Sequence, residues 1–292
     1  MALERLRGRR RAAAGRRSQH RAGRRSGSSS SSDLRARILV AVPAIAFAIL
    51  IVSMGGAVYA AGAVALGLVC LHELFGMYRR VQPIRLAAML SLVALAVAAY
   101  LGGQQQVLLV FMASLPLVFA VGLAMPRLER LTPSLALTLL GIVWIGLPIA
   151  FAIMLRELPH GGGITVDVLV GTFAADTAAY LGGRAFGTRR LAPRVSPNKT
   201  VEGLAIGILT AVLATWCAGL YQDWLSHGQA LLLGLAGGIA GPLGDLFESK
   251  VKRDAGTKDA GGLFGAHGGA LDRLDAALFT LVAGYYVWLA ML

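Results

Sequence analysis

The chain has 292 residues, of which 56% are hydrophobic and 15% are charged, and it carries a formal net charge of +13. Soluble domains typically contain about 45–50% apolar and about 25% charged residues, so these values argue against an ordinary soluble protein. The apolar content excludes a disordered chain, and a count of two cysteines excludes a disulfide scaffold. What remains is an integral membrane protein with its charge concentrated in part of the chain.

Most of the excess charge lies in residues 1–37, which hold twelve arginines but only Glu4 and Asp33 as acids. This stretch contains a serine run at 28–32 and has no apolar periodicity, so we predict a disordered, Arg/Ser-rich cytoplasmic tail that contacts anionic lipid headgroups. Nucleic-acid binding and an organelle transit peptide are the alternative interpretations of such a segment. We expect no nucleic-acid partner.

Nine apolar stretches follow, and a helix needs about 20 mostly apolar residues to cross a bilayer. They span approximately 38–54, 56–75, 86–101, 107–124, 133–155, 164–183, 203–221, 230–249 and 273–292. With the tail in the cytoplasm, alternation of sides assigns 27 of the 28 Lys and Arg residues to the cytoplasmic face and Arg156 alone to the opposite face. This asymmetry follows the positive-inside rule. We therefore predict an all-α, polytopic protein with about nine transmembrane helices in the cell inner (plasma) membrane.

The first ionisable group inside a span that draws attention is Asp176, because such groups are costly and mark candidate functional sites. It lies about seven residues before the expected end of the sixth span, roughly 10 Å below the interface. An ion pair, for example with Arg184, is the structural alternative. The next segment, 184–203, holds five basic residues and a helix start at Ser196 or Thr200. Its composition suits a polyphosphate or ordinary positive-inside charge, and both interpretations stay open.

The richest region joins the eighth and ninth spans. Asp245 and Glu248 are three residues apart at the end of one span, and Asp272 and Asp275 have the same spacing at the start of the next. Because the two spans are antiparallel, both pairs lie at the same depth and are expected to converge. Oxygen-rich clusters favour Mg²⁺ over Zn²⁺. The glycine-rich connection is typical of loops whose amides approach phosphate oxygens.

This region resembles the signature of the phosphatidate cytidylyltransferase family. The matching positions are Ser249, Val251, Lys252-Arg253, Lys258-Asp259, Gly261, Phe264-Gly265, His267-Gly268-Gly269, Asp272-Arg273 and Asp275. Ala270 departs from the pattern, since the family usually has a larger apolar residue there, and should affect only packing. Residues 176–187 and the Ser-Pro-Asn-Lys-Thr-x-Glu-Gly segment at 196–203 also resemble the family.

The resemblance implies an all-helical enzyme that joins CTP to phosphatidate with Mg²⁺, and possibly a second cation, giving CDP-diacylglycerol and pyrophosphate. It implies metal binding by Asp245 and Asp272, to which we add Asp275, Asp176 and Asp259 as further candidates. The candidate catalytic residues are Asp245, Lys258, Asp259, His267, Asp272 and Arg273. The candidate substrate-binding residues are Asp176, Arg184, Ser196, Lys199, Thr200, Glu202, Lys252, Arg253, Gly268 and Gly269.

These assignments divide the chain into the tail (1–37), N-terminal transmembrane helices (38–155) and a C-terminal transmembrane catalytic region (156–292) whose active site faces the cytoplasm. An ion-coupled transporter and a CTP-dependent lipid kinase are the competing functions. The acids gather at one membrane face without an inverted repeat, which argues against transport. CTP, phosphatidate and membrane lipid are the expected partners. The sequence leaves the oligomeric state open, a homodimer included.

Overall fold

The computed structural model describes residues 48–125, 128, 130–261 and 268–292. The chain divides into two compact units, Met1–Ala48 and Ile49–Leu292, and the second contains every element named below. The tail and most of the first expected span, including residues 38–47, lie outside the described residues. Residues 48–54 are helical.

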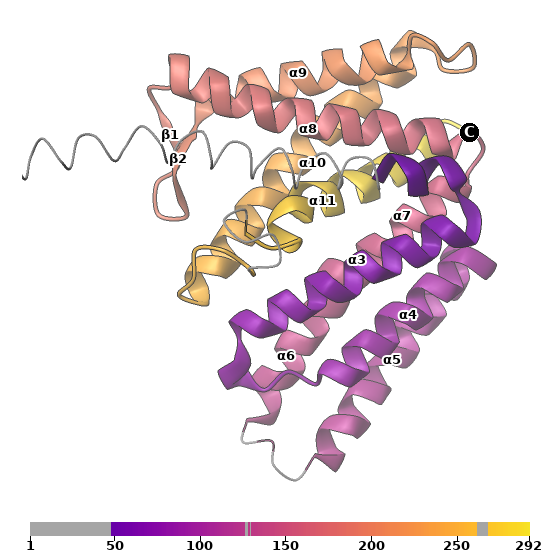
Figure 1. Cartoon of the computed structure of the whole chain (residues 1–292), viewed down its shortest axis with the longest axis vertical. Helices are drawn as coiled ribbons and strands as arrows, with labels where there is room; N and C mark the ends of the chain where they lie inside the picture. Colours follow the sequence, from indigo (N-terminus) through magenta and orange to yellow (C-terminus); the bar gives the residue numbers. More distant parts are fainter. Residues whose placement is uncertain (1–47, 126–127, 129, 262–267) are drawn as a thin grey trace, which may run out of the picture. The chain divides into compact units, whose positions relative to one another are not determined.

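The N-terminal half of this unit is helical (Figure 1). Its elements are α3 (Gly56–Met77), the 3₁₀ turn η1 (Arg79–Val81), α4 (Arg85–Leu101), α5 (Gln104–Ala124), α6 (Leu131–Gly141), the π-helical turn η2 (Ile142–Gly146) and α7 (Leu147–Glu157). The segments α6, η2 and α7 form one continuous apolar stretch, Leu131–Glu157. Pro148 lacks an N–H and cannot donate to the carbonyl one turn earlier, which accounts for irregular helix geometry at this point.

In the described part of the C-terminal half there are four helices and one small hairpin. They are α8 (Gly161–Phe186), β1 (Arg190–Ala192), β2 (Ser196–Thr200), α9 (Val201–Gly219), α10 (His227–Asp254) and α11 (Leu271–Leu289). The strands pair antiparallel, with Arg190 opposite Thr200 and Ala192 opposite Ser196. A turn with Pro193 in its second position joins them, closed by the Val195 N–H donating to the Ala192 carbonyl at 3.1 Å.

The predicted all-α polytopic fold is confirmed. Among the described residues, six helices are long and apolar enough to cross a membrane: α3, α5, the α6–α7 stretch, α8, α9 and α10. The count of nine is not established, because α4 has 17 residues and α11 carries three charged residues in its first five positions. Two loops expected from the sequence are instead partly helical. α8 extends to Phe186 and includes Arg184, and α10 extends to Asp254 and includes Lys252 and Arg253.

The α6–α7 stretch is the best-buried of the six candidate spans. α7 packs against α3, α4, α8 and α11, and the largest fully buried side chains lie here and on its neighbours. They include Leu71, Phe75, Leu92, Ile145 and Ile153. α8 and α9 run side by side, and α10 packs against both α9 and α11 (Figure 1). The C-terminal end of α10 therefore meets the N-terminal end of α11.

Two close backbone approaches position the later site. At Gly203, a Cβ atom would lie 2.6 Å from the carbonyl oxygen of Ala179, so the start of α9 can contact α8 only with a glycine there. At Gly244, a Cβ atom would lie 2.4 Å from the carbonyl oxygen of Asp275, which brings α11 directly against α10. Small residues permit such approaches between helices in membranes.

Candidate active site

Three carboxylates meet between α10 and α11. Asp245, Glu248 and Asp275 each offer an oxygen, and these oxygens all lie within 4.8 Å of one another. Glu248 is fully buried, and Asp275 is 9% exposed. The spacing of three on α10 places Asp245 and Glu248 on one helix face, and the close approach at Gly244 brings in Asp275. The predicted convergence of the two helix ends is thus present, and the oxygen-only donor set suits a hard divalent cation.

Two lysines neutralise part of this negative charge. Lys199, at the end of β2, forms an ion pair with Asp245. Lys252, one turn after Glu248 on α10, lies 2.5 Å from a Glu248 oxygen and 2.7 Å from an Asp272 oxygen. Buried carboxylates need such partners because an uncompensated charge in a poorly solvated environment is strongly destabilising. Lys199 and Lys252 were expected to contact substrate phosphates, and here they contact the acids.

Asp272 occupies a different place from the other predicted metal ligands. Besides its ion pair with Lys252, its Oδ2 atom accepts hydrogen bonds from the backbone N–H groups of Gly269 at 2.7 Å and Ala260 at 3.0 Å. Gly268 has a φ of +78°, and a Cβ atom there would lie only 2.5 Å from the same oxygen, so a larger residue would clash with Asp272. Asp272 therefore fastens the two described edges of the glycine-rich connection, and Lys252 links it to the carboxylate cluster.

Glu73, which the sequence analysis did not single out, lies beneath the same connection. This residue of α3 is 7% exposed and accepts a hydrogen bond from the Leu271 N–H, the first residue of α11, at 2.9 Å. Cβ atoms at Gly261 and Gly269 would lie 2.4 and 2.3 Å from its carboxylate oxygens. Its negative charge at a helix N-terminus is favourable. An acid inside the second expected span was the signal available in the sequence.

The end of α8 and the start of α9 are joined by Glu202 and Thr200. Glu202 accepts hydrogen bonds from the Thr188 hydroxyl at 2.6 Å and from the backbone N–H groups of Thr188 and Arg189. Thr200 accepts from the Gly203 N–H at 3.1 Å and caps α9. Both side chains thus make structural contacts within the protein. The sequence left Ser196 or Thr200 as the cap, and Thr200 takes the role while Ser196 lies in β2.

The remaining predicted residues differ in their distance from the cluster. Asp176 on α8 is close enough to Asp245 and Lys199 to interact with them electrostatically. Arg253 points its Nε atom at the Val195 carbonyl of the hairpin, at 3.5 Å. Four others have exposed side chains outside the cluster: Arg184, Lys258, Asp259 and Arg273. His267 lies outside the described residues.

Tyr78 ties the end of α3 to the end of α10. Its hydroxyl donates to the Val251 carbonyl at 2.9 Å and to Asp254 at 3.1 Å. Burial and the adjacent Asp254 carboxylate raise the pKa of Tyr78 to about 12, so the phenol stays a donor at neutral pH. Together with Glu73, this contact anchors the helix ends around the cluster to the N-terminal half.

These features define a polytopic, all-α membrane protein with a buried carboxylate cluster at the meeting point of two helix ends. The chain belongs to the cytidylyltransferase family, whose model matches residues 35–291. The predicted family membership is confirmed.

Three relatives illustrate the similarity. The chain is 39% identical over 150 residues to the phosphatidate cytidylyltransferase of Bacillus subtilis, covering 51% of this chain and 56% of that protein. It is 43% identical over 136 residues to the phosphatidate cytidylyltransferase of Synechocystis, covering 45% of each. It is 44% identical over 128 residues to the Escherichia coli protein YnbB, covering 44% of this chain and 43% of YnbB. The chain thus spans about half the length of the curated relatives it matches.

Proposed function

We propose that this protein is a phosphatidate cytidylyltransferase that converts CTP and phosphatidate to CDP-diacylglycerol and pyrophosphate. The observation that carries the proposal is the buried set Asp245, Glu248 and Asp275 flanked by Lys199 and Lys252. It occurs in a chain of the cytidylyltransferase family, and two similar proteins bear the same activity in their names.

In the proposed reaction, a phosphate oxygen of phosphatidate attacks the α-phosphorus of CTP. A new oxygen–phosphorus bond forms, the bond to the α–β bridging oxygen breaks, and pyrophosphate leaves with that electron pair. A phosphate monoester has a second pKa near 6 and is largely dianionic at neutral pH. No residue is therefore needed to remove a proton from the nucleophile. The difficulty is that one anion must approach another, so the protein must position both and neutralise their charge.

The residues present fit Mg²⁺, the ion that the family implies. Asp245, Glu248 and Asp275 provide carboxylate oxygens within 4.8 Å of one another, and the donor set contains neither sulfur nor nitrogen. When bound, the ion would supply charge neutralisation for the phosphate oxygens. Asp272 lies outside this set and stays a predicted ligand. Lys252 connects it to the set, since this lysine contacts both Asp272 and Glu248. A second cation also stays a prediction.

The positive side chains around the cluster suit the phosphates of the nucleotide. Lys199 and Lys252 already contact the carboxylates, so they can bind phosphate oxygens beside the same acids. Arg253 precedes the glycine-rich connection in the chain, Lys258 lies within it and Arg273 follows it, and all three would bind the leaving pyrophosphate. Glu73 and Asp272 would hold that connection in place. Asp176, Arg184, Ser196, Thr200, Glu202, Gly268 and Gly269 would shape the substrate site.

We further propose that the active site faces the cytoplasm, where CTP is available, and that the protein resides in the inner membrane. Phosphatidate would keep its acyl chains in the bilayer while its phosphate reaches the cluster. The strong bias of Lys and Arg toward one face supports this orientation.

The test is to incubate the purified protein in detergent with CTP labelled in the cytidine, phosphatidate and Mg²⁺, and to identify the products. Pyrophosphate together with a cytidine-labelled lipid is the expected result. Release of labelled CDP would instead identify a CTP-dependent lipid kinase, and no reaction with either substrate would overturn the proposal.

A further inference from the structure

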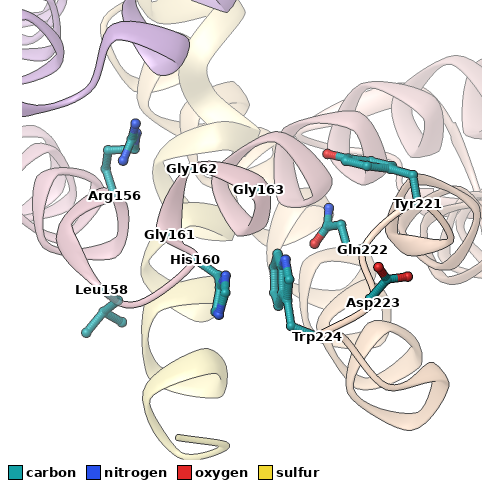
Figure 2. Close-up of a pocket in the computed structure, with 10 residues that line it drawn as sticks. All are labelled: Arg156, Leu158, His160, Gly161, Gly162, Gly163, Tyr221, Gln222, Asp223 and Trp224. Carbon is teal, nitrogen blue, oxygen red and sulfur yellow. The ribbon is translucent and has the colours of Figure 1, made fainter.

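A pocket lies at the N-terminal end of α8 (Figure 2). It has a volume of about 580 Å³, and its lining includes Arg156, Gly162, Gly163, Gln222, Asp223 and Trp224. Gly161 precedes Asp176 by 15 residues on the same helix, which is about 22 Å along its axis. The pocket shares no lining residue with the cluster, so the proposed reaction does not account for it.

One side of the pocket is built for an anion. The first intrahelical bond of α8 runs from the Ile164 N–H to the His160 carbonyl, so the N–H groups of Gly162 and Gly163 are first-turn donors at the positive end of the helix. The Arg156 guanidinium adds a full positive charge beside these amides. A Cβ atom at Gly162 would lie 3.2 Å from its Cζ atom. Its Nε atom donates to the Val52 carbonyl at 2.9 Å, which fixes the guanidinium there.

Another residue of the lining, Gln222, has a side-chain oxygen that could accept a hydrogen bond from a ligand. Gln222 is 6% exposed, and its Nε2 atom donates to both oxygens of the buried Asp167 at 2.9 and 3.0 Å. These bonds fix the amide so that Oε1 has no hydrogen-bond partner within the described part of the chain. That oxygen would lie 3.2 Å from a Cβ atom at Gly163, so it lies against the first turn of α8, where Gln222 lines the pocket (Figure 2). Asp223 adds an exposed carboxylate to the lining.

Aromatic rings surround this end of the helices. His160 stacks on Trp224 with ring centroids 4.1 Å apart, and Trp224 meets Trp288 edge to face at 5.7 Å. The Trp288 indole N–H donates to the Pro159 carbonyl at 2.9 Å. Tryptophan and tyrosine gather where a membrane meets water. We therefore expect the pocket to lie at the depth of lipid headgroups, and it contains Arg156, the one basic residue that the predicted nine-span topology assigns to this face.

We propose that this pocket binds the headgroup of a phospholipid that carries both a phosphate and a primary ammonium group. The phosphate would contact Arg156 and the amides of Gly162 and Gly163. The ammonium would donate to the Gln222 Oε1 atom and to the Asp223 carboxylate. A quaternary ammonium has no N–H to donate and would leave the buried amide oxygen without a partner, which is costly. The pocket thus distinguishes a primary amine from a trimethylated one.

The test measures which lipids stay bound to the full chain. The purified protein in detergent is exposed to an equimolar mixture of phosphatidylethanolamine and phosphatidylcholine with matched acyl chains, and bound lipids are counted by native mass spectrometry. We expect at least about tenfold preference for phosphatidylethanolamine, equivalent to about 1.4 kcal/mol. Equal retention of the two lipids would overturn the proposal. Free phosphoethanolamine is then added. Displacement shows that the headgroup alone is recognised, and retention shows that the intact lipid is the ligand.

Two variants locate the binding. Gly163→Ala adds a methyl group 3.0 Å from Trp224 and 3.2 Å from Gln222, and we expect it to lower phosphatidylethanolamine occupancy about tenfold. The matched control is Gly228→Ala, at the start of α10, where a Cβ atom would meet nothing within 4 Å. Asp223→Asn removes an exposed negative charge that attracts either ammonium group, and it should weaken binding of both lipids while Gln222 keeps the preference for the primary amine. Wild-type phosphatidylethanolamine occupancy in both Gly163→Ala and Asp223→Asn would contradict the assignment.

Discussion

The carboxylate cluster and the pocket lie at opposite ends of α8 and α10, and they differ in how many charged groups they bring together. At one end, Asp245, Glu248 and Asp275 are gathered between helices and partly neutralised by lysines. At the other end, charged groups are few, and aromatic rings and first-turn amides line an open pocket. Burying several acids together is costly, so a protein retains such a cluster where it serves a purpose. On this comparison we expect the chemistry to take place at the carboxylate cluster and not at the pocket.

Asp272 is the residue whose replacement we expect to slow the reaction most. Asp272→Asn keeps the size of the side chain but removes the charge that holds Lys252 and accepts from Gly269 and Ala260. We expect the kcat for CDP-diacylglycerol formation to fall by about 10³-fold, the scale of a lost electrostatic group in an active site. Asp254→Asn, in the last turn of α10, keeps an oxygen that can accept from the Tyr78 hydroxyl, so it is the matched control and should retain activity. Near-normal turnover by Asp272→Asn would remove this residue from the site.

A somewhat smaller loss is expected from Glu248→Gln. This residue is fully buried between two helices and pairs with Lys252 at 2.5 Å. Loss of one candidate ligand should reduce kcat by about 10²-fold and raise the Mg²⁺ concentration needed for half-maximal rate. Steady-state rates measured across a Mg²⁺ titration give both quantities. A reduced rate with an unchanged Mg²⁺ requirement would show that Glu248 acts only through packing.

Glu73 tests how far the active end depends on the N-terminal half. Glu73→Gln removes the negative charge at the start of α11 while leaving an oxygen able to accept from the Leu271 N–H. Because small displacements of positioned groups slow catalysis strongly, we expect kcat to fall about tenfold with little change in KM for CTP. His72→Gln changes the adjacent, exposed side chain and should behave as wild type. A change in KM alone would show that Glu73 affects CTP binding and not positioning.

The smallest effect concerns the segment that carries Lys199. Thr200→Ala removes the cap of α9 and should lower stability by about 1 kcal/mol, observed as a lower Tm in detergent. Thr200→Ser retains the hydroxyl and should restore the wild-type Tm. If the two variants melted alike, the cap would contribute nothing measurable.

Much of the fold follows from the sequence because membrane spans are specified by long apolar runs. The stretch expected at 133–155 matches the continuous segment Leu131–Glu157, and α3, α5, α8, α9 and α10 overlap their expected ranges. The hairpin of β1 and β2 was not anticipated. Its strands have only three and five residues and are too polar to produce a strand pattern in the sequence. The hairpin also depends on the turn that contains Pro193.

The candidate site was predicted in part. The spacing of Asp245 with Glu248, and of Asp272 with Asp275, indicated that the helix ends would meet, and they do. The sequence could not show which acids form the cluster. Whether Asp272 or Glu248 joins it depends on the rotation of α11 against α10 at Gly244. Glu73 was overlooked because its partner, the Leu271 N–H, is 198 residues away in the chain.

One carboxylate at each end of the helices can be replaced and the two variants compared in the same assay. Asp245 lies in the cluster, and Glu157 lies exposed at the end of α7, on the side of the pocket. With CTP, phosphatidate and Mg²⁺, we expect Asp245→Asn to reduce CDP-diacylglycerol formation by at least about 10²-fold and Glu157→Gln to leave it unchanged. Equal rates for the two variants, whether both high or both low, would contradict the assignment of the chemistry to the carboxylate cluster.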